Sequence, residues 1–187
     1  MKVESTNSPA KPARKFVVRA RPMGLREGLS LESEAAGTIG RSAPSMTLVD
    51  ANLLLYACDS SAPQHRAARR WLEDAFSGAE PVLLPWNSIL AFLRIATNPM
   101  AWKHPLSVHE AVGMIDEWLS LPNVIVPTPG ERHWPILRGL LPEAQCRGPL
   151  AMDAHLAALA IEHGAVMCTH DRDFARFPGL RLSDPLE

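Results

Sequence analysis

The chain has 187 residues, of which 47% are hydrophobic and 21% are charged, and its net charge is −1. This composition is typical of one soluble globular domain. No apolar run is long enough to span a bilayer, and the polar residues 1–5 lack the apolar core of a signal peptide. We therefore expect a cytoplasmic protein without a membrane partner. Three scattered cysteines fit reduced thiols better than a disulfide framework or a zinc site: Cys58, Cys146 and Cys168.

The composition changes near Met46. Residues 1–45 are rich in Ser, Pro, Gly, Ala and Arg and contain eight Lys/Arg and four Asp/Glu, a net charge of +4. The rest of the chain therefore carries −5. Within the first part, Phe16 to Arg21 is predicted to extend as a strand, followed by a turn at two glycines. We divide the chain into a basic, largely extended segment with its linker, residues 1–45, and a globular domain, residues 46–187.

Short apolar runs alternate with amphipathic segments after this boundary. We predict strands over residues 47–50, 81–85, 123–127, 165–169 and 177–182. We predict helices over residues 51–57, 60–77, 86–97, 107–119, 130–141 and 151–163. Ser107 and Glu110 have the spacing of a capping box, and Gly164 is typical of a helix C-terminus. Strands that alternate with helices predict an α/β sandwich with a parallel sheet and right-handed crossovers.

Acidic side chains follow two of these strands and begin one of the helices. Asp50 ends the first strand, and Asp171 follows the strand over 165–169. Asp153 lies in the first turn of the last helix, where the helix dipole favours a carboxylate. Each of these residues alone is explained as a turn or cap residue. Because function gathers outside the carboxyl ends of strands in open α/β sheets, we expect the three to share one pocket if the two strands are neighbours.

Several carboxylates in one pocket repel each other and raise one another's pKa values. A divalent cation removes this cost, and Mg²⁺ takes oxygen ligands and substrate phosphate. Such an ion activates water and stabilises the leaving oxygen of a phosphodiester. His155 and His170 flank the acids, so a zinc site is conceivable, but the number of carboxylates favours a harder ion.

Four segments in this order resemble the PIN-domain ribonucleases of the VapC toxin type: residues 49–52, 92–99, 153–160 and 169–174. The resemblance covers the chain from Met46 to its end. It implies a PIN-like three-layer α/β sandwich with a mostly parallel central sheet flanked by helices. It also implies a Mg²⁺- or Mn²⁺-dependent endoribonuclease, usually a homodimer, that acts on RNA such as tRNA or rRNA and has a VapB-type antitoxin as partner.

By position, the resemblance implies that Asp50, Asp153 and Asp171 are catalytic, metal-binding carboxylates and that Asp173 is a further metal ligand. It also implies that Asn52 and Thr169 orient these acids or a water, and that Arg94 binds a phosphate. One departure concerns Ala91, because many PIN domains carry a glutamate at this place and residues 86–97 contain no acid. Asn87 and Ser88, one turn earlier, could hold a metal-bound water. Sites with one metal ion and with two therefore remain alternatives.

Residues 16–28 resemble the C-terminal, toxin-binding tail of a VapB-type antitoxin without its DNA-binding half. This resemblance implies a natural or engineered fusion in which Met46 is the toxin's own start. A plain extension or a misassigned start codon is the alternative. We expect the tail to lie over the acidic pocket, in the same chain or across a dimer. Arg21 and Arg26, and then Arg19, are the candidates for a guanidinium that replaces the metal charge and blocks phosphate entry.

Two other functions remain open. A metal-dependent DNase would use the same carboxylates, because an acidic cluster does not distinguish the two sugars. A catalytically impaired binding module is the other, and the missing glutamate favours it. Since the domain is net negative, RNA affinity has to come from local cations: Arg66, Arg69, Arg70, Lys103, Arg172 and Arg176.

Overall fold

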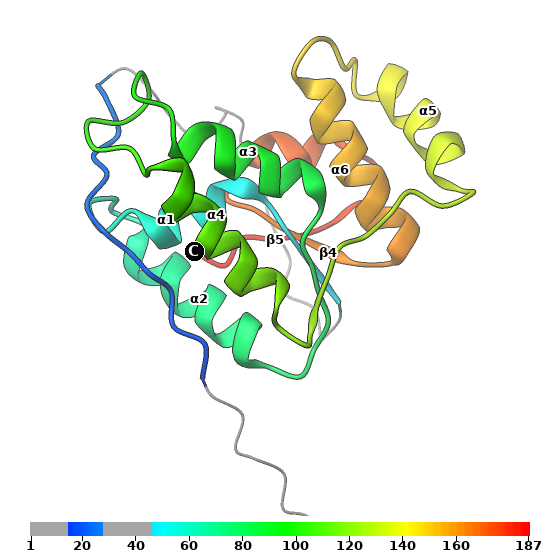
Figure 1. The fold of residues 1–187 in the computed structure, drawn as a ribbon. Coiled ribbons are helices and arrows are strands. Elements are labelled where there is room, and N and C mark those ends of the chain that lie inside the picture. The colour runs from blue at the N-terminus through cyan, green and yellow to red at the C-terminus, as the bar shows by residue number, and fades with distance from the viewer. Residues whose placement is uncertain (1–14, 28–45) are drawn as a thin grey trace, which may run out of the picture.

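The computed structural model describes residues 15–27 and 46–187. Five strands form a parallel sheet in the order β3-β2-β1-β4-β5 (Figure 1). Their bounds are β1 Thr47–Val49, β2 Val82–Leu83, β3 Val124–Ile125, β4 Val166–Cys168 and β5 Arg181–Ser183. The first four lie within the predicted runs. The fifth begins four residues later than predicted, because the 3₁₀ helix η1, Arg172–Arg176, is followed by a turn at residues 178–179, where Gly179 has a φ of +77°.

Six α-helices surround the sheet: α1 Ala51–Cys58, α2 His65–Ser77, α3 Trp86–Ala96, α4 Val108–Leu119, α5 His133–Glu143 and α6 Leu150–His163. The predicted capping box of Ser107 and Glu110 begins α4, and Gly164 ends α6 with a φ of +64°. α2 begins later than predicted. The carboxylate of Asp59 binds both the backbone N–H and the hydroxyl of Ser61, which makes a turn where the helix was expected.

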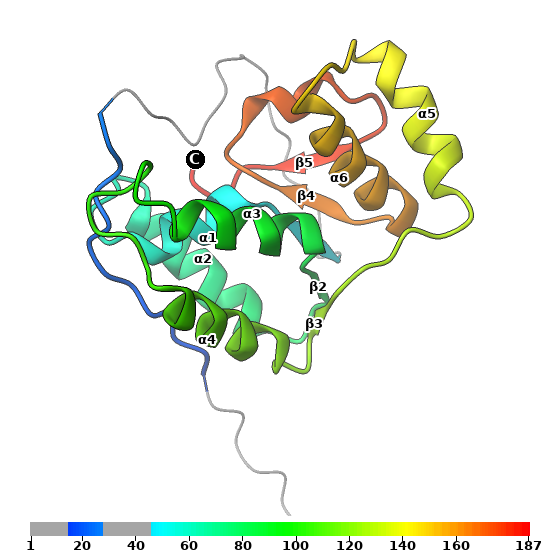
Figure 2. The same ribbon diagram turned by 45° about the horizontal axis from the view of Figure 1, so that its top comes forward.

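The pleat of the strands separates two apolar layers. Leu48, Leu83 and Met167 face α5 and α6, whereas Val49 and Cys168 face α1 to α4. Figure 2 shows these two groups of helices on opposite sides of the sheet. The fold is therefore an α/β/α sandwich, as predicted.

The register of the sheet aligns the ends of two central strands. Leu48 of β1 pairs with Met167 of β4, and Val49 pairs with Cys168. The expectation that these strands are neighbours is confirmed. Asp50, directly after β1, and Thr169, directly after β4, therefore reach the same edge of the sheet.

Residues 15–27, which we call the tail segment, cross α1, α2 and α4 (Figure 1). Val18 and Met23 are 2% and 0% exposed and belong to the same apolar layer as α1 to α4. The strand predicted over Phe16 to Arg21 is wrong. The backbone N–H groups of Phe16 and Val18 bind the side chains of α2 instead of a neighbouring strand.

Within residues 15–27 and 46–187, no helix has the length and apolar character needed to cross a membrane.

Candidate functional site

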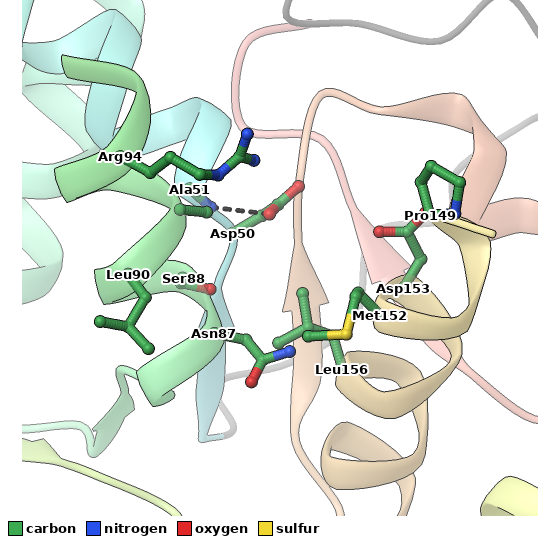
Figure 3. Close-up of a pocket in the computed structure, with 11 residues that line it drawn as sticks. Asp50, Ala51, Asn87, Ser88, Leu90, Arg94, Pro149, Met152, Asp153 and Leu156 are labelled. Carbon is green, nitrogen blue, oxygen red and sulfur yellow. Dashed lines mark hydrogen bonds between the residues drawn. The ribbon is translucent and has the colours of Figure 1, made fainter. Parts of the chain in front are cut away.

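A cleft of about 480 Å³ opens between α3 and α6, beside the carboxyl end of β1. Figure 3 shows two carboxylates, Asp50 and Asp153, and one cation, Arg94, around it. Its remaining lining residues come from the start of α1, from α3 and from the start of α6: Ala51, Asn87, Ser88, Leu90, Ala91, Pro149, Met152 and Leu156. Acidic and apolar side chains therefore share one opening.

Asp50 is fixed at the junction of β1 and α1. Its backbone N–H donates to the carbonyl of Cys168, and its Oδ1 accepts the N–H of Ala51 at 2.7 Å as the cap of α1. Its Oδ2 accepts the hydroxyl of Thr169 at 2.7 Å. Both carboxylate oxygens are thus held by donors, so the direction of the carboxylate is set.

Thr169 connects three parts of this edge. The side chain is fully buried, and besides donating to Asp50 its Oγ1 accepts from Asn52 Nδ2 and from the backbone N–H of Asp171, both at 3.0 Å. The end of β4 is therefore tied to α1 and to the acidic loop. Asn52 and Thr169 lie where the sequence placed them, beside the acids.

The acids influence each other electrostatically. Burial raises the pKa of Asp50 from 3.8 to about 6, the hydrogen bonds from Thr169 and Ala51 oppose this, and the charges of Asp171 and Asp153 add to the rise. Burial also raises the pKa of Asp153 from 3.8 to about 6. The charges of Asp171 and Asp173 push it up further, and Arg176 lowers it. The site therefore gathers several carboxylates whose negative charges raise one another's pKa values.

Asp171 and Asp173 lie beside the cleft rather than in its lining. Asp171 is the N-terminal cap of η1, and its Oδ1 accepts the backbone N–H of Asp173. Asp173 is 8% exposed, and its Oδ1 accepts Arg176 Nη2 at 2.7 Å. The sequence analysis treated Arg176 as an RNA-binding cation and missed this ion pair, which the i, i+3 spacing could have indicated.

The helix α3 brings a row of side chains to the cleft. Ala91 faces the opening, so the place where a glutamate is common contributes no charge. Arg94, one turn further on, presents an exposed guanidinium beside Asp50. Asn87 Nδ2 and Ser88 Oγ are buried, and neither atom has a hydrogen-bond partner among the described residues.

The donor set suits a hard divalent cation. Carboxylates with raised pKa values beside hydroxyl and amide oxygens are the ligands that Mg²⁺ and Mn²⁺ accept. Among the described residues, however, no three His, Cys, Asp or Glu side chains already stand in a metal-binding arrangement. Direct ligation by all the predicted acids would therefore require side-chain movement or bridging waters.

The three arginines of the tail segment lie elsewhere. Arg19 pairs with Glu117 and Arg21 with Glu110, both on α4. Arg26 donates to the carbonyl of Pro99, after α3. The expectation that one of these guanidinium groups lies among the acids of the same chain is therefore wrong.

The sequence of this chain is similar to that of known proteins. The family model of the PIN domain matches residues 47–180. The chain belongs to the PIN-domain family. Ribonuclease VapC37 of Mycobacterium tuberculosis is 41% identical over 140 residues, which cover 75% of this chain and 97% of that protein. Ribonuclease VapC33 of the same organism is 42% identical over 141 residues, 75% of this chain and 99% of that protein. The family match begins at residue 47, so the tail segment lies outside it.

Solved structures show the same PIN fold. VapBC2 of Rickettsia felis, bound to a DNA fragment from their promoter, has a TM-score of 0.56 at 15% identity and covers 74% of this chain and 97% of that one. VapC20 of Mycobacterium tuberculosis, a sarcin-ricin loop cleaving toxin, has a TM-score of 0.53 at 19% identity and covers 73% and 99%. These likenesses concern the fold alone.

Proposed function

We propose that this PIN-domain protein is an endoribonuclease of the VapC toxin type, which hydrolyses RNA phosphodiesters with Mg²⁺ or Mn²⁺. The observation that carries the proposal is the meeting of three acids: Asp50 after β1, Asp171 after β4, and Asp153 in the first turn of α6, near enough for their charges to act on one another. The identity of about 40% to ribonucleases VapC37 and VapC33 supports the choice of RNA over DNA.

The proposed site divides the work among its side chains. Asp50, Asp153 and Asp171 would hold the metal ion. Asp173 would be a further ligand, although its Oδ1 is engaged by Arg176. A bound ion of this kind supplies an activated water and stabilises the leaving oxygen.

The remaining residues orient the acids and the substrate. Thr169 holds the Asp50 carboxylate in one direction, and Asn52 holds the Thr169 hydroxyl. Arg94 neutralises the scissile phosphate, for which its exposed guanidinium at the mouth of the cleft is suited. Ser88 would take the place of the missing glutamate by holding a water at the metal site, because its buried hydroxyl has no partner among the described residues.

The substrate class is structured RNA, tRNA or rRNA, in the cytoplasm. Several cations named from the sequence are engaged with acids: Arg69 with Glu73, Arg172 with Glu187, and Arg176 with Asp173. These pairs leave Arg66, Arg70, Lys103 and Arg94 as the phosphate-binding set, for which no ion pair is found among the described residues.

The proposed partners are a VapB-type antitoxin and a second copy of the chain. Exposed Trp86 on α3 and Trp134 on α5, 52% and 60% exposed, are apolar side chains that a homodimer interface would cover.

The tail segment acts as a built-in antitoxin tail in this proposal. It occupies the surface of α1, α2 and α4 through buried Val18 and Met23, and Met23 N–H donates to buried Asp59 at 2.8 Å. Since its arginines bind α4 and the loop after α3, inhibition acts by occupying this surface or across a dimer, rather than by an arginine in the acids of the same chain.

A cleavage assay tests the activity. The full chain is incubated with total RNA and with single-stranded DNA in Mg²⁺ or Mn²⁺, beside the Asp50→Asn, Asp153→Asn and Asp171→Asn variants. We expect RNA cleavage that each variant abolishes with little loss of folding, and a milder loss in Asp173→Asn. Cleavage of DNA alone identifies a DNase. Absence of cleavage by a folded wild-type chain, with and without its tail, identifies a binding module, and activity retained in two of the three variants overturns the assignment.

A further inference from the structure

The cleft has two chemically different ends. Asp50, Asp153 and Arg94 form a charged end, as described above. Away from these charges, Met152 and Leu156 of α6 face Asn87 of α3 across the opening (Figure 3). The whole cleft, about 480 Å³, is within the range of roughly 300–1,000 Å³ that is usual for small-molecule sites. The acids therefore need only part of it.

The side-chain amide of Asn87 is a buried hydrogen-bond donor without an acceptor among the described residues. Its Nδ2 atom is buried and makes no hydrogen bond with the described residues, and Figure 3 shows the amide pointing into the space between α3 and α6. A buried donor without an acceptor costs about 1–3 kcal/mol, and such groups are rare in folded proteins. A bound group that presents an acceptor would remove this cost.

The neighbouring surface suits a flat apolar group. Met152 is 57% exposed although it is apolar, and its thioether is a favourable contact for an aromatic face. Leu156, one turn along α6, is 5% exposed and extends the same wall. A nucleobase has flat faces for such a wall and a polar edge for the amide.

We propose that this end of the cleft is a nucleobase slot, in which a base packs on Met152 and Leu156 and accepts a hydrogen bond from Asn87 Nδ2. The inference rests on the proposed function, because it places the base beside a phosphate held at the charged end. In this slot the base presents its exocyclic group to Asn87, where an N–H donor pairs with the carbonyl oxygen of uracil or guanine and not with the amino group of adenine or cytosine. Asn87 is therefore the residue that determines base preference near the cut.

Cleavage mapping tests the slot. Total RNA is cut by the full chain, and the ends are sequenced to find positions where a base is enriched. We expect uracil or guanine at one position next to the cut. Asn87→Asp replaces the donor by an acceptor of the same shape, so the enrichment should fall by about fivefold or more, as expected for loss of one buried hydrogen bond. Adenine or cytosine should gain at that position.

Matched variants separate the slot from other effects. Asn98→Asp makes the same chemical change at an exposed position just after α3 and should leave the base preference unchanged. Met152→Ser removes part of the wall at an exposed position, so it should fold and should weaken the same preference even if Asn87→Asp does not fold.

The outcomes distinguish the two proposals. If the wild-type chain cuts no RNA, either with or without residues 1–45, the proposed function fails, and the slot fails with it. If it cuts RNA and the folded Asn87 and Met152 variants keep the wild-type base preference, the slot is wrong and the proposed function stands. A wild-type chain that cuts without any base preference also overturns the slot.

Discussion

The hydroxyl of Thr169 donates a hydrogen bond of 2.7 Å to Asp50 Oδ2 and so joins the end of β4 to the end of β1. The two residues are 119 positions apart in the chain. Thr169→Val keeps the shape of the side chain but removes this donor and the acceptor for Asn52. We expect cleavage to fall strongly and the free energy of unfolding to fall by about 1–3 kcal/mol. Thermal melting and a cleavage assay measure both effects.

Thr169→Ser is the matched control, because it keeps the hydroxyl. The hydrogen bond from Thr169 lowers the pKa of Asp50, so its loss should also move the acidic limb of the pH–rate profile to higher pH. An unchanged profile in a folded Thr169→Val protein would show that this contact does not control the carboxylate.

The second prediction concerns pH and stability in the absence of metal. The pKa of Asp50 is about 6 in the folded chain against 3.8 for the free group, so deprotonation opposes folding. The free energy of unfolding should therefore fall as pH rises from about 4 to about 6, by at most about 3 kcal/mol from this group. Asp50→Asn should melt several degrees higher than wild type at pH 7.5 in EDTA and equally at pH 4.

Asp153→Asn should behave in the same direction, because the pKa of Asp153 is raised to the same value. The control is Asp116→Asn, since Asp116 is exposed on α4 and should melt like wild type at both pH values. If Asp50→Asn and Asp153→Asn both lower the melting temperature at pH 7.5, burial and the neighbouring charges do not raise the pKa values of these acids.

The third prediction concerns the metal. Calorimetric titration of the full chain with Mn²⁺ at pH 7.5 should show one strong site that disappears in Asp171→Asn and persists in Asp116→Asn. Its affinity should weaken as pH falls below about 6, because protonation of Asp50 and Asp153 competes with the ion. Ala91 faces the cleft without a charge, so a second ion should bind tightly only in Ala91→Glu. Two tight ions in the wild-type chain would contradict this.

The fourth prediction concerns the tail segment. Deleting residues 1–45 should raise RNA cleavage and make expression toxic to the host, because the surface of α1, α2 and α4 is then open. The deletion should also lower the melting temperature. Val18 and Met23 are buried, and burying such a side chain contributes about 1.5–3 kcal/mol.

Met23→Asp offers a smaller change with the same purpose. It should loosen the tail segment, because the side chain of Met23 is fully buried. The backbone N–H of Met23 also binds the carboxylate of Asp59, so the new aspartate would bring a second negative charge close to it. Equal cleavage by the full chain, by Met23→Asp and by the deletion in moderate salt would show that the tail does not inhibit.

Much of the fold followed from local patterns. Alternation of apolar runs with amphipathic segments was sufficient for the sheet and its helices, and Asp50 and Asp171 were predicted to meet because strand ends share an edge. The pair of Asp173 and Arg176 was missed because it depends on a 3₁₀ turn between two strands. Such a turn leaves no apolar period in the sequence.

The position of the tail segment also escaped prediction, for a different reason. Opposite charges of +4 and −5 favour docking but do not say where. Two of the three arginines that were expected among the acids, Arg19 and Arg21, form exposed pairs with Glu117 and Glu110, and such pairs contribute only about 0–1 kcal/mol. The binding position is set instead by where Val18 and Met23 find apolar surface, which several distant elements build together.

The burial of Met23 has a consequence for proteolysis. A cut between residues 28 and 45 would separate the tail segment from the domain in sequence, but its buried side chains and backbone hydrogen bonds would still hold it in place. The contact would change from an intramolecular one, with an effective concentration of the order of millimolar, to a bimolecular one. After such a cut, the fraction of the domain that carries the tail segment would fall on dilution. A single broken peptide bond would therefore make the binding of the tail segment depend on the protein concentration.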